Sequence, residues 1–431
     1  MTGDLTKLPP YSSKADFKAL AAANAAFREV LQQGLVDFQD PATQKALLSA
    51  QLQVDFGLKI DLPDDRLCPP VPNRFNYVAW IQGLVDSTST DYQDRYDSDR
   101  KVTGLDIGTG TSAIYTLLAL QCRPNWIMCA TDIDKKSFDS AAHNLAINGL
   151  LTRTKLLQTT KDNDLIPLQY LGVDRLDFTV CNPPFFVDAK EMRNSLTGEG
   201  KNKIPSAACT GTETEMVCEG GEVGFVTRIV NESLRLKDKV TWYSSMLGKL
   251  DSAKAIIELL KKHEINNWAV GVLEPGDVTK RWVVAWSFGD LRPRNGIARI
   301  EGISHAHLPF PTEYRISLAG GVIDISQVEQ TVDTTLSSLD LDWTWNPGAL
   351  TGIGTASQNV WNRKYRREYE KRQKSGEAIQ TEQPKKVELA FRIRMSYLTT
   401  PKEIVVEWLK GRDVVLWESF CGMLHGKFKT K

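Results

Sequence analysis

Residues 176–186 read Leu-Asp-Phe-Thr-Val-Cys-Asn-Pro-Pro-Phe-Phe, a strand-like run that ends abruptly in Asn182-Pro183-Pro184-Phe185. Two consecutive prolines have no N–H groups to donate and fix φ, so a sheet ladder must stop there. In such a stiff turn the Asn182 amide oxygen and the Pro183 carbonyl can accept from one small donor, while Phe185 offers a flat apolar face. An exocyclic amino group on a flat ring fits this arrangement, although a strand followed by a plain proline-rich loop gives the same pattern.

A second stretch, residues 102–112, reads Val-Thr-Gly-Leu-Asp-Ile-Gly-Thr-Gly-Thr-Ser and predicts a strand, a glycine turn and a helix start. The turn has an acidic residue, Asp106, and two glycines, Gly108 and Gly110, but neither the P-loop pattern nor the three-glycine dinucleotide pattern. A nucleoside without phosphates suits this turn better. The next predicted strand ends at Asp132, where a carboxylate can accept from both hydroxyls of a ribose.

Strands and helices alternate along this part of the chain, which predicts an α/β fold with a Rossmann-like sheet of seven mostly parallel strands. Strands are expected near 102–107, 126–131, 156–160, 176–181, 240–247, 268–273 and 282–287, with helices near 112–121, 135–148, 222–236 and 252–263. In a parallel sheet, Gly108, Asp132 and Asn182 then meet at the carboxyl edge of the strands, where ligands bind. This places a nucleoside-binding turn beside an amino-group clamp.

The flanking segments predict two further parts. Residues 1–72 are expected to form a helical extension with helices over 16–33 and 41–56, residues 73–289 the α/β domain, and residues 290–431 an α+β module. A connector over 68–72 precedes a helix beginning near residue 73, residues 187–219 are expected to be a long loop, and residues 314–318 and 321–325 show strand-like alternation.

Charged residues give less specific signals. Arg74, at the start of a predicted helix, is either a solvated surface group or a partner for a ligand carboxylate. The basic stretch 362–372 is a solvated helix, a phosphate-binding stripe or a nuclear-import signal. With 53 Lys+Arg and 53 Asp+Glu, the net charge is zero, so a nucleic-acid surface must be a local patch.

Composition sets the remaining limits. The 431 residues are 42% hydrophobic, and their seven cysteines are scattered without a C-x-x-C pair, which favours free thiols and argues against a zinc site. No apolar leader region and no run of about 18 apolar residues occurs. We expect a nuclear or cytoplasmic protein with no membrane segment and no metal site, and leave its oligomeric state open beyond the possibility of a monomer.

Together, these motifs resemble the eukaryotic U6 snRNA adenosine N(6)-methyltransferase family over roughly residues 10–289. The resemblance rests on residues 106–110, 130–132, 181–186, 219–222, 242–249 and 281–288. It implies a class I methyltransferase that uses S-adenosylmethionine and clamps a flipped-out adenosine with Asn182, Pro183, Pro184 and Phe185. It also implies cofactor contacts at Arg74, Asp106, Gly108, Thr109, Gly110, Ser112, Asp132, Asn163 and Asn182.

For RNA, contacts are predicted at Phe186, Lys201, Lys203 and Arg281, and in the C-terminal module at Arg363, Lys364, Arg366 and Arg367. Basic residues are sparser in the N-terminal arm and in the loop after the clamp than the family tends to have, so the C-terminal module is expected to add RNA affinity. The leading hypothesis is N(6)-methylation of an adenosine in U6 snRNA or a similar structured RNA. A protein glutamine methyltransferase and a mainly RNA-binding splicing factor remain as alternatives.

Overall fold

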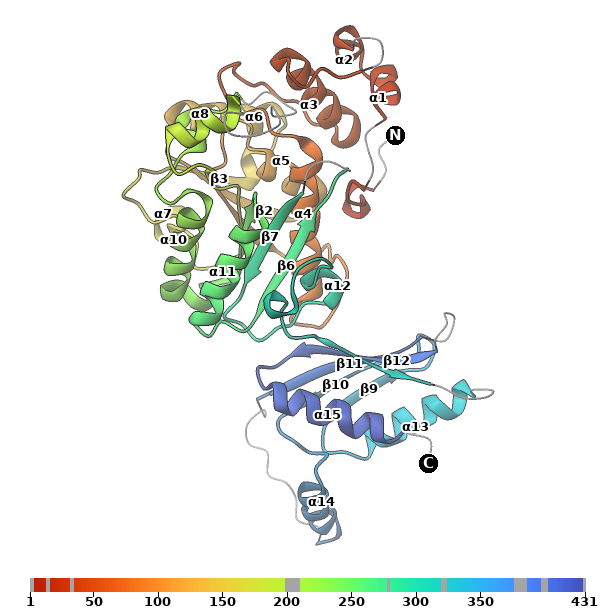
Figure 1. Ribbon diagram of the computed structural model, residues 1–431. Helices are drawn as coiled ribbons and strands as arrows, with labels where there is room; N and C mark the ends of the chain where they lie inside the picture. The colour runs from red at the N-terminus through yellow and green to blue at the C-terminus, as the bar shows by residue number, and fades with distance from the viewer. Residues whose placement is uncertain are drawn as a thin grey trace. The chain divides into compact units, whose positions relative to one another are not determined.

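The chain forms two compact units (Figure 1). The computed structural model describes residues 4–12, 16–31, 35–197, 210–276, 280–318, 324–375, 386–396 and 402–428. Unit 1 consists of Met1–Asp86, Arg95–Gly289 and Ile297–Pro309, and unit 2 consists of Ser87–Asp94, Asp290–Gly296 and Phe310–Lys431. Each unit therefore contains pieces of chain that are distant in sequence.

Unit 1 is built on a seven-stranded sheet in the order β3-β2-β1-β4-β5-β7-β6. Its strands are β1 Val102–Ile107, β2 Trp126–Asp132, β3 Thr154–Gln158, β4 Leu176–Cys181, β5 Val240–Leu247, β6 Trp268–Leu273 and β7 Arg281–Trp286. The neighbouring pairs from β3 to β5 are parallel, and β7 is antiparallel to both β5 and β6. This confirms the predicted fold class.

Helices cover both faces of this sheet. Successive strand residues point to opposite sides, and apolar side chains on both sides have to be buried. On one face, β4 contributes Phe178 and Val180 to a core shared with α4 Val71–Ser87, α5 Ile114–Cys122 and α6 Lys135–Ile147. On the other face, Cys181 joins a core with α10 Gly221–Leu236 and α11 Leu250–Lys262, beside the short α7 Leu168–Leu171. Strands buried on both faces explain why their sequences are nearly continuous apolar runs.

The N-terminal extension differs from the prediction of one helix over 16–33. It forms α1 Phe17–Ala23 and α2 Ala25–Val30, followed by α3 Pro41–Phe56. Asn24 between the first two is extended, and its side chain accepts a 2.9 Å hydrogen bond from the N–H of Phe27, so this residue ends one helix and caps the next. The start of α3 after Asp40 agrees with the prediction, since both carboxylate oxygens cap the first turn.

Other element boundaries also differ. The long loop expected over 187–219 contains α8 Ala189–Thr197 and α9 Glu213–Met216. The connector is shorter than predicted because α4 begins at Val71, and a proline is tolerated in a first helical turn. The third strand, β3, begins at Thr154, earlier than the expected residue 156. Short elements complete unit 1: η1 Leu5–Lys7, η2 Leu151–Arg153, η3 Lys237–Lys239 and η4 His305–His307.

Unit 2 contains a five-stranded antiparallel sheet in the order β8-β12-β11-β10-β9. Its strands are β8 Glu313–Ser317, β9 Asp342–Asn346, β10 Thr351–Ala356, β11 Leu389–Ser396 and β12 Glu403–Lys410, and its helices include α13 Ile325–Ser337, α14 Arg363–Ser375 and α15 Val414–Gly426. Trp408 of β12 stacks on Trp417 of α15 at 5.5 Å, which anchors α15 to the sheet. The predicted strand-like run 321–325 is wrong at Ile325, which begins α13, and residues 321–323 lie outside the described ranges. The short α12 Asn295–Ala298 lies at a unit boundary.

Residues 87–94 are bound into unit 2 by charge. The Asp94 carboxylate pairs with Arg392 at 3.4 Å, with Arg294 at 3.6 Å and with Arg394. Two of these arginines, Arg392 and Arg394, lie on β11. They also pair with Glu407 on β12, at 2.9 Å and 3.2 Å. The segment that precedes β1 in the sequence is therefore part of the second fold.

Candidate active site

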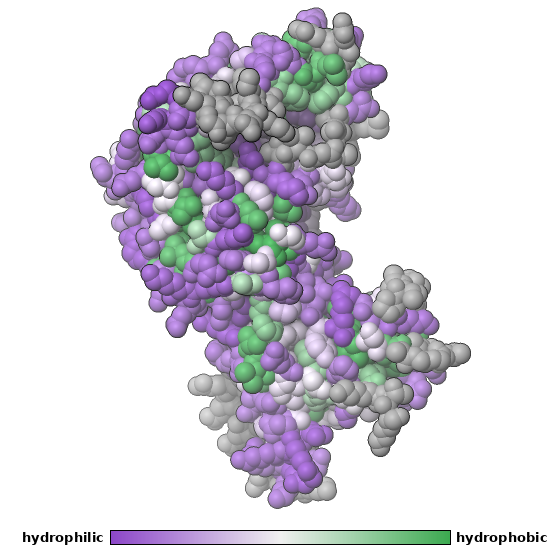
Figure 2. Space-filling model, viewed as in Figure 1, coloured by the Kyte–Doolittle hydropathy of each residue, from purple (hydrophilic) through white to green (hydrophobic). Residues whose placement is uncertain are grey.

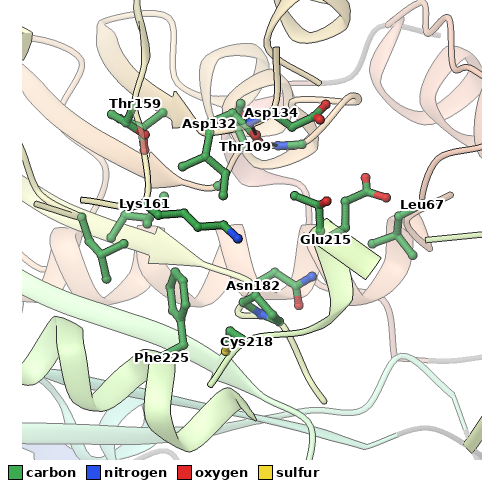
Figure 3. A pocket seen from close by; sticks show the side chains of 18 of the residues that line it. Leu67, Thr109, Asp132, Asp134, Thr159, Lys161, Asn182, Glu215, Cys218 and Phe225 are labelled. Carbon is green, nitrogen blue, oxygen red and sulfur yellow. Dashed lines mark hydrogen bonds between the residues drawn. The ribbon is translucent and has the colours of Figure 1, made fainter. Parts of the chain in front are cut away.

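A cavity of about 770 Å³ opens at the carboxyl edge of the large sheet (Figure 3). It lies where β1, β2 and β4 end, as the sequence predicted for the glycine turn, the acidic residue and the clamp. Its lining includes these predicted residues: Arg74, Gly108, Thr109, Gly110, Ser112, Asp132, Asn163, Asn182 and Pro184. Asp106, Pro183 and Phe185 are outside this lining.

Hydrogen bonds to the buried Asp106 stabilise the glycine turn. Gly108 and Gly110 have φ values of 69° and 64°, in the left-handed region that favours glycine. The buried Asp106 carboxylate accepts hydrogen bonds from the hydroxyls of Thr109 at 2.8 Å and Thr116 at 3.0 Å. Burial raises the pKa of Asp106 to about 6, although these two hydrogen bonds act to lower it. Asp106 therefore shapes the turn rather than lining the cavity.

Asp132 ends β2 and projects into the cavity. One carboxylate oxygen accepts from the N–H of Gly110 at 2.8 Å, and the other accepts from the N–H of Asp134 at 2.9 Å. Burial raises the pKa of this carboxyl, and the two main-chain hydrogen bonds oppose that shift. Each carboxylate oxygen has a second lone pair, so Asp132 can still accept from a pair of ligand hydroxyls.

Arg74 is a buried cation in this lining. It comes from α4, is 6% exposed, and lies over the Tyr115 ring with its guanidinium carbon 5.8 Å from the ring centroid. Within the described ranges, no acidic side chain forms an ion pair with Arg74, and the sulfur of Met246 is 3.9 Å from its Nη1. A buried guanidinium without an ion-pair partner favours the prediction that Arg74 binds a ligand carboxylate over the alternative that it is a solvated surface group.

The Asn-Pro-Pro turn contains a hydrogen-bond acceptor, Asn182 Oδ1, to which no described group donates. Asn182 Oδ1 is buried and has no hydrogen-bond partner among the described residues. Pro184 lines the cavity, whereas the Phe185 side chain packs against the first core of the sheet and a methyl group at Gly248 would come within 3.3 Å of its ring. The main chain of Phe186 pairs with Val217 in an isolated parallel bridge.

Some lining residues were missed by sequence reasoning. They are Lys161 and Asp164 after β3, residues 213–215 and 217–219, and Phe225 and Arg228 of α10. Figure 3 shows the Lys161 side chain reaching between Asp132 and Asn182. Its position just after β3 follows the same edge rule that selected Asp132, so the rule applied to every strand would have found it. Asn163 is in the lining, but its Oδ1 accepts from the N–H of Thr160 at 2.8 Å.

The predicted RNA contacts are distributed over both units of the chain. Arg281, at the start of β7, is partly buried, and burial together with nearby Arg74 lowers its pKa. Arg363, Lys364, Arg366 and Arg367 are exposed on α14, whose surface is almost entirely hydrophilic (Figure 2). Lys201 and Lys203 lie outside the described residues.

The described ranges offer neither a metal-binding cluster nor a helix able to span a membrane. They contain no group of three His, Cys, Asp or Glu side chains that is arranged to hold a metal ion. None of their helices is both long enough and apolar enough to cross a membrane.

The lining suits the cofactor that the resemblance implies. S-adenosylmethionine carries a ribose and an amino-acid carboxylate. The cavity presents an oriented carboxylate at Asp132 and, at Arg74, a buried cation that has no acidic partner among the described residues. The glycine turn between them leaves open space above Gly108 and Gly110, where an added methyl group would meet nothing within 4 Å. The residues present therefore fit the group.

Known proteins match a large part of this chain. A family described as RNA methyltransferase matches residues 6–290. The U6 small nuclear RNA (adenine-(43)-N(6))-methyltransferase of Schizosaccharomyces pombe is 33% identical over 398 residues, which cover 91% of this chain and 95% of that protein. The RNA N(6)-adenosine-methyltransferase METTL16 of Gallus gallus is 37% identical over 290 residues, 64% of this chain, and the match spans about half of that protein, 49%.

Solved structures give the same result. The hMettl16 catalytic domain in complex with MAT2A 3′UTR hairpin 1 has a TM-score of 0.56 and 34% identity, and the match covers 64% of this chain and 91% of that one. The N-terminal domain of human METTL16 in complex with SAH has a TM-score of 0.51 and 32% identity, with coverage of 64% and 95%. Because the family match extends over more than half of the sequence, the chain belongs to the RNA methyltransferase family.

Proposed function

We propose that this RNA methyltransferase transfers a methyl group from S-adenosylmethionine to the exocyclic N(6) amino group of an adenosine in U6 snRNA or a similar structured RNA. The observation that carries the proposal is the Asn182 amide oxygen, which is buried at the cavity wall without a donor among the described residues. A buried acceptor without a donor costs free energy, so a ligand donor at that point is favoured. An adenine amino group is such a donor.

The clamp acts on the nucleophile. The lone pair of the adenine amino group is delocalised into the ring, which makes it a poor nucleophile. Acceptors at Asn182 Oδ1 and the Pro183 carbonyl hold both amino hydrogens and favour the pyramidal geometry that frees the lone pair for attack. After the nitrogen has attacked the methyl carbon and the carbon–sulfur bond has broken, the methylated nitrogen carries a strongly acidic proton, which water can remove, so no side-chain base is required.

S-adenosylmethionine supplies the electrophilic methyl group when it is bound. In this chain, Asp132 is placed to accept from its ribose hydroxyls and Arg74 to pair with its carboxylate, while the main chain of the glycine turn allows close approach. A relative solved with SAH and the S. pombe enzyme support this choice of cofactor and of the reaction.

A structured RNA is the proposed partner because relatives are named for U6 snRNA or were solved with an RNA hairpin. Arg363, Lys364, Arg366 and Arg367 on α14 are available to phosphates, and stacked Tyr365 and Tyr369 lie on the same helix with ring centroids 6.3 Å apart. U6 snRNA as the target and the basic stretch of α14 both support a nuclear location.

The test is single-turnover methylation of a U6-like hairpin, measured beside filter binding of the same RNA. Asn182→Ala removes one acceptor and is expected to slow methyl transfer while sparing RNA affinity, because phosphate contacts lie elsewhere. Phe185→Ala removes a predicted stacking face worth roughly 1–3 kcal/mol and is expected to impair capture of the flipped base as well.

Two controls identify the group that is methylated. A hairpin with purine riboside at the target position lacks the amino group and should not be methylated. Labelled cofactor with RNA-free protein extract should leave protein unlabelled, and labelled glutamine there would favour a protein methyltransferase. Methylation by Asn182→Ala at the wild-type rate would refute the clamp, and loss of RNA binding in proportion to activity would make Asn182 a structural residue.

A further inference from the structure

Residues 210–218, here called the strap, cross one side of the cavity. Glu213, Glu215 and Cys218 of the strap are in the cavity lining, and Figure 3 shows Glu215 and Cys218 beside it. The strap contains α9, which begins with a capping box in which the Thr212 main-chain N–H donates to Glu215 at 2.8 Å. The strap is thus a structured wall of the cavity.

Arg66 fastens the first end of the strap. It lies between α3 and α4, is 8% exposed, and its Nη1 donates to the Thr212 hydroxyl at 3.3 Å. The Arg66 carbonyl accepts from the Thr210 hydroxyl at 2.5 Å. The other guanidinium nitrogen, Nη2, forms a 3.0 Å ion pair with Asp134, which also caps α6 by accepting from the N–H of Ser137. One planar side chain therefore joins the strap to the loop that follows Asp132.

Main-chain hydrogen bonds fasten the second end. The N–H of Phe186 donates to the carbonyl of Met216 at 2.9 Å, and the N–H of Cys218 donates to the carbonyl of Phe186 at 3.0 Å. Phe186 directly follows the clamp residue Phe185. The strap is therefore attached both to the β2 side of the cavity, through Arg66, and to the clamp, through Phe186.

We propose that Arg66 is a positioning residue, which holds the strap closed over the bound cofactor and thereby keeps the segment after the clamp in place. Its fork geometry suits this task, since one guanidinium can serve two acceptors at once, whereas a lysine ammonium is a point charge on a flexible stem. The turnover part of this inference rests on the proposed function. Cofactor retention and strap order do not, and can be measured without RNA.

The experiment compares the full-length wild type with Arg66→Ala and Arg66→Lys. The release rate of S-adenosylhomocysteine is measured by stopped flow, and the exchange of the Phe186 and Cys218 amides is followed by hydrogen–deuterium exchange with saturating ligand. We expect Arg66→Ala to release the ligand about tenfold faster and to lose protection at both amides, with Arg66→Lys in between. With RNA, the KM for the cofactor should rise more than kcat falls.

Arg123→Ala is the matched control, because Arg123 is also buried and its guanidinium pairs with Asp86 at 2.7 Å, while Arg123 is not part of the cavity lining. It should change stability without changing ligand release. If Arg66 acts through Thr212, the double variant Arg66→Ala/Thr212→Val should release ligand no faster than the faster of its two single variants.

Wild-type release and exchange in a folded Arg66→Ala would overturn the proposal, as would equal acceleration by Arg123→Ala. If Arg66→Ala does not fold, Thr212→Val alone decides: faster release supports the proposal and unchanged release overturns it. Absence of RNA methylation by the wild type would instead refute the proposed function, while ligand release and amide exchange still test Arg66.

Discussion

The main-chain N–H of Gly110 donates a 2.8 Å hydrogen bond to the carboxylate of Asp132. This bond ties the glycine turn after β1 to the end of β2, two segments whose strands are parallel neighbours. Asp132 therefore both orients the turn and faces the cavity, so changes to it should affect cofactor binding in two ways.

Replacing this carboxylate should weaken the cofactor site. In Asp132→Ala the ribose loses its acceptors, and the affinity for S-adenosylhomocysteine should fall by on the order of 1.5–3 kcal/mol, measured by calorimetry. Asp139→Ala, which removes an exposed carboxylate paired with Lys135 on α6, is the control and should bind normally. Unchanged affinity in Asp132→Ala would contradict the assignment.

Arg74 can be tested with two ligands. Arg74→Met keeps an apolar stem but removes the charge, so affinity for S-adenosylhomocysteine should fall by about 1.5–3 kcal/mol. Affinity for 5′-methylthioadenosine, which has no amino-acid carboxylate, should not change, whereas Asp132→Ala should weaken both ligands. An equal loss for both ligands in Arg74→Met would show that Arg74 supports the cavity wall instead of pairing with a carboxylate.

Asp106 should make stability depend on pH. Its pKa rises from 3.8 to about 6 on folding because the carboxyl is buried, so the folded state binds more protons between these values. Its contribution to the free energy of unfolding should therefore decrease as pH rises through that window, by on the order of 2 kcal/mol. Relative to Asp106→Asn, which cannot titrate, the wild type should lose this amount between about pH 4 and about pH 6 in urea titrations. A difference that does not vary with pH would contradict the prediction.

The basic helix α14 predicts a salt effect. Changing Arg363, Lys364, Arg366 and Arg367 together to glutamine should weaken binding of a structured RNA and lower the salt slope by roughly one unit for each phosphate that the helix no longer binds. The affinity for S-adenosylhomocysteine should stay at the wild-type value. Lys135→Gln/Lys136→Gln removes two exposed lysines of α6 that pair with Asp139 and Asp65, and serves as the control. An RNA affinity and slope equal to the wild type would make α14 a solvated helix.

The sequence predicted the sheet and its carboxyl edge because those features depend on local signals. Gly108, Asp132 and Asn182 each follow an apolar strand, and parallel pairing alone is enough to bring them together. The break at Asn24 could have been read as a cap, but a run of alanine and leucine hid it. The strap could not be found, because its position depends on Arg66 and Phe186, which are far from it in sequence and contact it only in the folded chain.

The ion pairs of Asp94 have a consequence for any attempt to separate the units. Unit 2 is assembled from three pieces of chain, and the first of them precedes β1. A protease cut or a stop codon near residue 289 would leave residues 87–94 attached to unit 1, with Asp94 deprived of all three arginines that it contacts. Segments of the two units therefore alternate along the sequence, and a single cut of the chain cannot release unit 2 with all of its segments.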